Sequence, residues 1–118
     1  MTPTMIAIER DRITIHSSIE NTWLTQHQIA DTFEVFVSAV GSNIRSILKS
    51  GILYEDEVCR RERTANGNLT TLYNLEMVAA LAFRLKSHKA RLFRKWLVRQ
   101  ALKPVVVWKM PDMDTSLN

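Results

Sequence analysis

The side chains of this chain that are best suited to binding chemistry are basic, and they gather in its second half. Residues 1–59 carry four Lys or Arg against eight Asp or Glu, a net charge of −4, whereas residues 60–118 carry twelve against four, a net charge of +8. From Arg84 to Lys109 there are nine basic residues and no acidic one. Such a field of one sign attracts a polyanion, most commonly nucleic acid, although a solvated helix face accounts for it equally well.

Residue types that support catalysis or metal binding do not come together in the sequence. The only cysteine, Cys59, is followed by Arg60 and Arg61, which would lower its pKa, but an inert and partly buried thiol fits better without a paired His or second Cys. The acidic run Glu55–Glu57 falls in a predicted loop, and glycines at 41, 51 and 67 are too far apart for a phosphate loop. The three histidines are scattered at His16, His27 and His88. We therefore expect no catalytic residue, no metal site and no cofactor.

Length and composition predict one ordinary globular domain. The 118 residues suffice for a single core, and 46% hydrophobic with 24% charged residues is typical of a soluble protein. The longest apolar runs fall short of the about 20 residues of a membrane helix. A lone cysteine and an N-terminus without a signal-peptide pattern predict a cytoplasmic location. We place the domain at residues 1–103 and a partly disordered tail at residues 104–118.

The first third of the chain predicts two short strands followed by a helix. Met5–Ile8 and Ile13–His16 are β-like runs that we expect to form edge strands, with Trp23–Leu24 pairing back on the second run. A helix is predicted from Thr25 to Phe33, because Thr25 can cap it and Gln28, three residues on, completes a capping box.

A second helix is predicted from Ser38 to Ser50. Apolar residues recur at positions 40, 44, 47 and 48, and Gly51 follows as a C-cap. Two short helices joined by a few residues have the dimensions of a helix-turn-helix. The second helix would expose Ser42, Asn43, Arg45, Ser46 and Lys49.

A basic β-hairpin is predicted next. Val58–Thr64 and Leu69–Tyr73 are both β-capable, and Asn66-Gly67 between them favours a type I′ turn with positive φ at both residues. After a helix-turn-helix, such a hairpin is typical of a wing. Its first arm carries Arg60, Arg61 and Arg63.

Two longer helices are predicted at the end of the domain. The first runs from Leu75 to about Lys86, is capped by Asn74 and is almost entirely apolar, so we expect it to be the buried central element. The last helix, His88–Leu102, is capped by Ser87 and ends at Pro104. Beyond it, either Val105–Trp108 forms a short strand or the tail is disordered after Pro111. The basic positions that we assign to its outer face are Arg91, Arg94, Lys95 and Arg99. The aromatic side chains Trp23, Phe33, Phe93 and Trp96 are predicted to lie in the core, away from these basic residues.

Three blocks of the sequence resemble the N-terminal domain of the RhuM family of bacterial virulence-associated proteins. They are Trp23-Leu-Thr-Gln26 with Ile29-Ala30 and Phe33, then Tyr73-Asn-Leu75, then Phe93-Arg-Lys-Trp96. The resemblance covers roughly residues 13–102 and implies a fold similar to a winged helix-turn-helix that binds DNA, often near mobile elements. The predicted fold class is accordingly α+β and winged helix-turn-helix-like: short N-terminal strands, two short helices, a β-hairpin wing and two longer C-terminal helices.

The chain departs from this family at the turn between the two short helices. Family members follow the Phe that matches Phe33 with a Gly-Val-Asp-Arg-Ser-like turn, whereas Phe36 and Val37 stand here where an Asp and an Arg are expected. The second helix has therefore lost basic character, and phosphate contacts would supply most of the affinity.

Two functions remain open at this point. One is duplex DNA binding of modest specificity, as in a transcriptional regulator or a mobile-element-associated protein. The other is a protein-interaction module in which Phe36 and Val37 contact a protein partner or a second copy of the chain. A homodimer is compatible with both. The predicted DNA contacts are Ser42, Asn43, Arg45, Ser46, Lys49, Arg60, Arg61, Arg63, Lys89, Arg91, Arg94 and Lys95.

Overall fold

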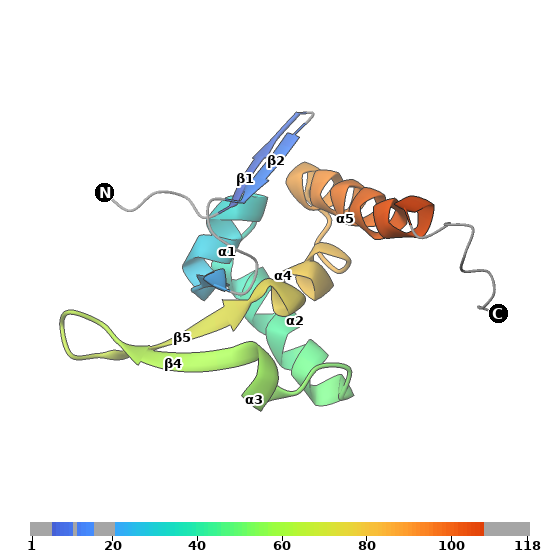
Figure 1. Cartoon of the computed structure of the whole chain (residues 1–118). Coiled ribbons are helices and arrows are strands. Elements are labelled where there is room, and N and C mark those ends of the chain that lie inside the picture. The colour runs from blue at the N-terminus through green and yellow to red at the C-terminus, as the bar shows by residue number, and fades with distance from the viewer. Residues whose placement is uncertain (1–5, 11, 16–20, 108–118) are drawn as a thin grey trace.

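The computed structural model describes residues 6–10, 12–15 and 21–107, with side chains up to residue 103 (Figure 1). Over these residues the chain is a compact α+β fold with five helices and two small antiparallel sheets. The strands are β1 (Ile6–Glu9), β2 (Arg12–Ile15), β3 (Trp23–Leu24), β4 (Cys59–Arg63) and β5 (Leu69–Asn74). The helices are α1 (Gln26–Phe33), α2 (Val37–Ser50), α3 (Glu55–Val58), α4 (Leu75–Ala82) and α5 (His88–Val107).

The strands form two separate sheets. β1 and β2 pair with Ile8 opposite Ile13, close to the two predicted edge strands, whose end residues Met5 and His16 lie outside the described part. The second sheet has the order β3–β5–β4. Trp23–Leu24 was expected to pair with the strand now labelled β2, and this prediction is wrong, because β3 pairs with the end of β5. This pairing sets Leu24, which is almost fully buried, opposite Tyr73 at the edge of the core.

The predicted capping box at the start of α1 is confirmed. The Gln28 backbone N–H donates to Thr25 Oγ1 at 3.1 Å, and the Thr25 N–H donates to Gln28 Oε1 at 2.8 Å. α1 ends at Phe33, and its C-cap residue Glu34 adopts a left-handed conformation with φ 57°. Three residues later α2 begins at Val37, one residue before the predicted start.

α1 and α2 pack closely at Gly41. The Gln26 side chain donates from Nε2 to the carbonyl oxygen of Val37 at 3.0 Å. A Cβ at Gly41 would lie 2.6 Å from the same Nε2, so a larger residue there would displace the Gln26 side chain from this hydrogen bond. α2 ends as predicted at Gly51, which has φ 82°.

The connection from α2 to β5 differs from the prediction at two points. Glu55–Glu57 were expected in a loop but form most of α3, because three acidic residues in a first helical turn favour a helix N-terminus. The hairpin itself is confirmed, but its predicted type I′ turn is wrong. Asn66 keeps a negative φ, and only Gly67 in this loop has a positive one, 88°. The Thr64 N–H donates to the Asn68 carbonyl at 2.7 Å, so the loop has three residues and needs one left-handed glycine.

α4 stops at Ala82, four residues before the predicted end. At this end Nη1 of Arg94, in α5, donates to the carbonyl oxygens of Ala82 at 2.7 Å and Leu85 at 2.9 Å, and so satisfies backbone acceptors that the helix leaves unpaired. The predicted caps of both helices are confirmed, since Asn74 Oδ1 accepts from the Met77 N–H and Ser87 Oγ accepts from the Ala90 N–H.

α5 continues through Pro104 to Val107, so the predicted helix end and the alternative strand at residues 105–107 are both wrong. Proline removes one backbone donor, but its fixed φ is compatible with a helix, and the following residues can resume the helical hydrogen bonds. The rest of the predicted tail, residues 108–118, lies outside the described part.

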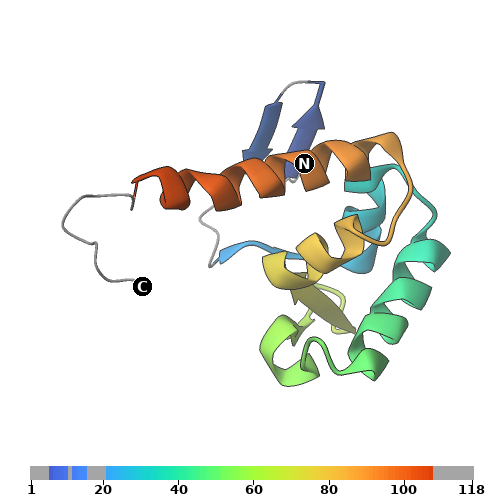
Figure 2. The same ribbon diagram turned by 90° about the vertical axis from the view of Figure 1, so that its right-hand side faces the viewer.

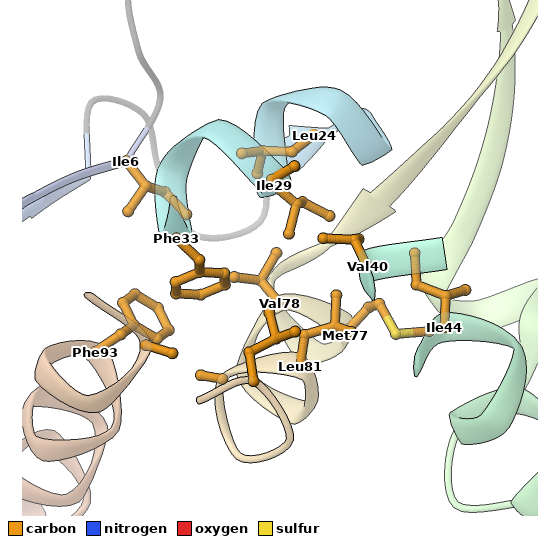
Figure 3. Close-up of a cluster of buried hydrophobic side chains, with 14 of the residues drawn as sticks. Ile6, Leu24, Ile29, Phe33, Val40, Ile44, Met77, Val78, Leu81 and Phe93 are labelled. Atoms are coloured by element: carbon orange, nitrogen blue, oxygen red, sulfur yellow. The ribbon is translucent and has the colours of Figure 1, made fainter. Parts of the chain in front are cut away.

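The core lies between α1, α2 and α4 and is closed by β1 and α5 (Figure 3). Phe33 of α1 meets Phe93 of α5 edge to face, with ring centroids 5.6 Å apart. α4 is the buried central element that the sequence predicted: Met77, Val78 and Leu81 are each almost fully buried. The core therefore fixes α2 by its apolar side and leaves its other side uncovered.

Candidate nucleic-acid interface

The exposed side of α2 is a polar strip that faces away from the core. Val40, Ile44 and Ile47 are buried, and at 3.6 residues per turn Ser42 and Ser46 lie on the opposite side of the helix. We call this strip the α2 face. Its exposed members are Ser38, Ser42, Arg45, Ser46 and Lys49.

Two predicted residues mark the edges of the α2 face. Arg45 is exposed on the edge next to α1, where its Nη1 lies near the packed Gln26 and Gly41. Asn43 lies on the other edge and is half-buried, with Nδ2 donating to the carbonyl oxygen of Ala39 at 2.9 Å. One amide hydrogen of Asn43 is thus used within the helix, which leaves Arg45 and Lys49 as the strong donors of this face.

A residue that the sequence reasoning missed also reaches the α2 face. Arg84, in the connection between α4 and α5, donates from Nη1 to Ser46 Oγ at 2.9 Å. The sequence placed Arg84 within a helix predicted to run to about Lys86. The early end of α4 instead brings this guanidinium beside α2, and no local sequence signal could have shown a contact between residues 38 positions apart.

The three hairpin arginines have different surroundings. Arg60 lies over the Trp23 ring, with Cζ 4.6 Å from the ring centroid, and pairs with Glu62 at 2.8 Å. Trp23 was expected in the core, but it is only partly buried and contacts a basic residue. Arg63 donates from Nη1 to the Gly67 carbonyl at 2.7 Å. Because side chains alternate along a strand, Arg61 and Arg63 share one face of the hairpin and Arg60 lies on the other.

Acidic residues of α3 lie beside the base of the hairpin. A shallow hollow of about 370 Å³ is lined by Glu55 and Asp56 together with Arg60 and Arg61. Burial and, second, Glu55 raise the pKa of the Cys59 thiol, while Arg61 lowers it less. The thiol is therefore not activated by its basic neighbours, and the positive field of the hairpin is partly offset at its base.

The basic residues of α5 form a separate stripe. Lys89 pairs with Glu34 at 3.3 Å, and Arg94 is half-buried with its guanidinium bound to backbone carbonyls. α5 packs against α1, α4, β1 and β2, and both views show it on the opposite side of the core from α2 (Figures 1 and 2). The predicted contacts therefore do not form one continuous surface. The exposed cations of α5, which we call the α5 stripe, are Arg91, Lys95, Arg99 and Lys103.

A groove lies between the start of α2 and the α4–α5 connection. It has a volume of about 590 Å³, with Val35, Ala39 and Leu85 among its apolar lining residues and Arg84 and Lys86 among its polar ones. Phe36, which also lines it, is the most exposed large apolar side chain described, at 83%. Val37, the second predicted partner contact, is only half-exposed.

Other sites find no support within the part of the chain that the structure describes. There, no group of three His, Cys, Asp or Glu side chains is placed to hold a metal ion, and no helix is long and apolar enough to cross a membrane. His27 and His88 are both exposed, and His16 lies outside the described residues.

Comparisons with known proteins add no identification: no family model matches the chain, and neither curated proteins nor solved structures give a match.

Proposed function

We propose that the chain is a winged helix-turn-helix module that binds duplex DNA and is not an enzyme. The order of elements supports the fold, since α1 and α2 are followed by a hairpin whose second strand pairs with β3, just before α1. In this assignment α2 is the recognition helix and β4–β5 is the wing. The resemblance to the RhuM family favours the same fold. The proposal includes a role as a cytoplasmic transcriptional regulator or mobile-element-associated protein.

One observation carries the proposal: the α2 face is polar, uncovered and edged by arginines, while the opposite side of the same helix is anchored in the core. The major groove of B-DNA is wide enough to admit one α-helix. Three small serines of the α2 face, at positions 38, 42 and 46, let DNA approach α2 closely. Arg45 and Lys49 then contact bases or phosphates, and Arg61 and Arg63 contact the backbone beside the groove.

This arrangement gives binding of modest specificity. A bidentate side chain contributes about 1–3 kcal/mol of discrimination between bases, and α2 offers few such donors. Phosphate contacts should therefore dominate, which makes the affinity fall steeply with salt.

The test is a titration of labelled duplex with the full chain at about 50 mM and about 200 mM salt. We expect binding at the lower concentration and a marked loss at the higher one. Failure to bind any duplex at the lower concentration would contradict the proposal. Selection from a random duplex library then separates a specific regulator, which enriches a motif, from a binder without sequence preference.

A second candidate function is protein interaction through the start of α2. It is favoured by the 83% exposure of Phe36 beside the apolar lining of the groove. Isolated exposed apolar residues are common on proteins, whereas one at the edge of a groove fits a partner contact better. We rank this function below DNA binding because Val37 points less outward and the neighbouring α2 face is polar.

Light scattering on the wild-type chain and on Phe36→Asp tests its self-associating form. A dimer in the wild type that dissociates in the variant supports an interface at Phe36. A monomer in both cases counts against self-association there.

A further inference from the structure

We propose that the α4–α5 connection is a second phosphate-binding element, in which Arg84 and Lys86 grip the DNA strand on the side of α2 away from Arg45. This inference rests on the proposed function and adds residues to it. It starts from the contact between Arg84 and Ser46, which joins the connection to the middle of the α2 face.

The position of Arg84 follows from how α4 ends. The guanidinium of Arg94 donates to the carbonyl oxygens of Ala82 and Leu85 and so holds the backbone on both sides of Arg84. Arg94 is therefore not available to bind DNA. The Arg84 side chain is exposed, and one of its nitrogen atoms is held 2.9 Å from Ser46 Oγ. A guanidinium fixed at one nitrogen keeps its other donors available, and a positioned group loses less entropy on binding.

The two edges of α2 are thereby matched in charge. Arg45 lies on the edge next to α1, and Arg84 lies on the edge marked by Asn43, which lines the same groove. A helix in the major groove has one phosphate backbone on each side, so cations at both edges meet different strands. Ser42 and Ser46 between them are too short to hold the helix away from the base edges.

Lys86 extends this second element. It is exposed, lines the same groove as Arg84, and forms no ion pair with any described residue. The acidic residue of the groove, Glu34, is already paired with Lys89 at 3.3 Å. Charge at this edge is therefore net positive, which suits the phosphate backbone.

The test compares two doubly substituted chains with the wild type in duplex titrations at about 50 mM and about 200 mM salt. Arg84→Gln with Lys86→Gln removes the proposed element, and Arg91→Gln with Lys95→Gln removes the same charge from the α5 stripe. The ratio of the affinity at the lower salt concentration to that at the higher one should fall about threefold for each lost phosphate contact. For the first variant this ratio should therefore fall about tenfold. The α5 variant should keep the wild-type ratio.

Three outcomes have separate meanings. A wild type that binds while the Arg84 and Lys86 variant keeps its salt ratio overturns this inference and leaves the proposed function standing. Equal losses in both variants also overturn it, because they reflect total charge and not position. A wild type that binds no duplex overturns the proposed function and this inference together.

Two single variants sharpen the assignment to Arg84. Arg84→Gln should lower the ratio of duplex affinities at the two salt concentrations. Arg84→Lys keeps the charge, so its ratio should stay close to that of the wild type. Ser46→Ala removes the group that holds the guanidinium and should weaken binding with little change in the ratio. Circular dichroism and urea unfolding of each variant check that the fold is intact.

Discussion

Two helices of this protein present several exposed basic residues, and the helix with more of them is the less organised for recognition. The α5 stripe has four exposed cations on one helix. The α2 face has two of its own, Arg45 and Lys49, but it gains Arg84 from a different part of the chain. The hairpin projects on this side of the fold and not on the side of α5 (Figure 1).

Under the proposed function, the density of charge does not identify the binding face. Two of the six cations on α5 are committed within the protein: Lys89 pairs with Glu34, and Arg94 holds the end of α4. The remaining four are exposed along one side of the helix. On the α2 face fewer cations stand at defined edges around small side chains, which is the arrangement that a groove-binding helix needs.

The comparison within α5 gives the largest expected effect on stability. Arg94→Met removes charged hydrogen bonds to two backbone carbonyls and should lower the free energy of unfolding by about 2 kcal/mol. Arg91→Met, a matched change on the exposed stripe, should stay within about 0.5 kcal/mol of the wild type. Urea unfolding measures both. Equal losses in the two variants would show that Arg94 has no special structural role.

The N-terminal caps of α2 and α5 differ. α5 is capped by Ser87, whereas the N-cap of α2 is Phe36, which forms no side-chain cap. Phe36→Ser should therefore raise the free energy of unfolding by about 1 kcal/mol, and Ser87→Ala should lower it by a similar amount. Thermal unfolding checks the pair. A loss of stability in Phe36→Ser would mean that Phe36 packs more firmly than its exposure indicates.

Glu34 lies between α1 and α2 and pairs with Lys89 of α5, and its substitution should have a smaller effect on stability. Its left-handed backbone costs about 1 kcal/mol, while its partly exposed ion pair with Lys89 returns only a fraction of that. Glu34→Gly should thus stabilise the protein by about 0.5 kcal/mol, and Lys89→Gln should change stability by less than about 0.5 kcal/mol. Chemical unfolding of both variants tests this. A destabilised Glu34→Gly would mean that the ion pair stabilises the protein by more than the left-handed backbone of Glu34 costs.

Cys59 tests the electrostatics at the base of the hairpin. Burial raises the pKa of its thiol, so the thiolate, which is the reactive form, forms only at higher pH than in the unfolded chain. At pH 8 iodoacetamide should modify the folded protein more slowly than the urea-unfolded chain, and the rate should rise with pH. Faster modification of the folded protein would mean that Arg60 and Arg61 dominate and that the hairpin base is strongly positive.

Local features of this fold could be predicted from the sequence because they depend on residues a few positions apart. The capping box of Thr25 and Gln28, the left-handed Gly51 and the cap at Ser87 were all predicted and are present. The hairpin was placed correctly, although its turn type was wrong, because Asn66-Gly67 supports more than one loop length.

Features that depend on distant residues could not be predicted. The partner of β3 is β5, fifty positions away, and nothing near Trp23 indicates it. The backbone on both sides of Arg84 is held by Arg94, which the sequence placed among the exposed cations of the last helix. The proposed site thus combines α2 residues that the sequence pointed to with an α4–α5 edge that the sequence did not indicate.

The most direct test of the account is to remove two charges from each surface in turn and measure duplex binding at about 50 mM salt. Arg45→Gln with Lys49→Gln should weaken binding at least about tenfold, because each residue contributes about 1 kcal/mol or more from a base or phosphate contact. Arg91→Gln with Lys95→Gln should stay within about twofold of the wild type, since only the screened long-range field changes. The reverse order, with the α5 variant the weaker binder, would contradict the assignment of the α2 face as the DNA-binding surface.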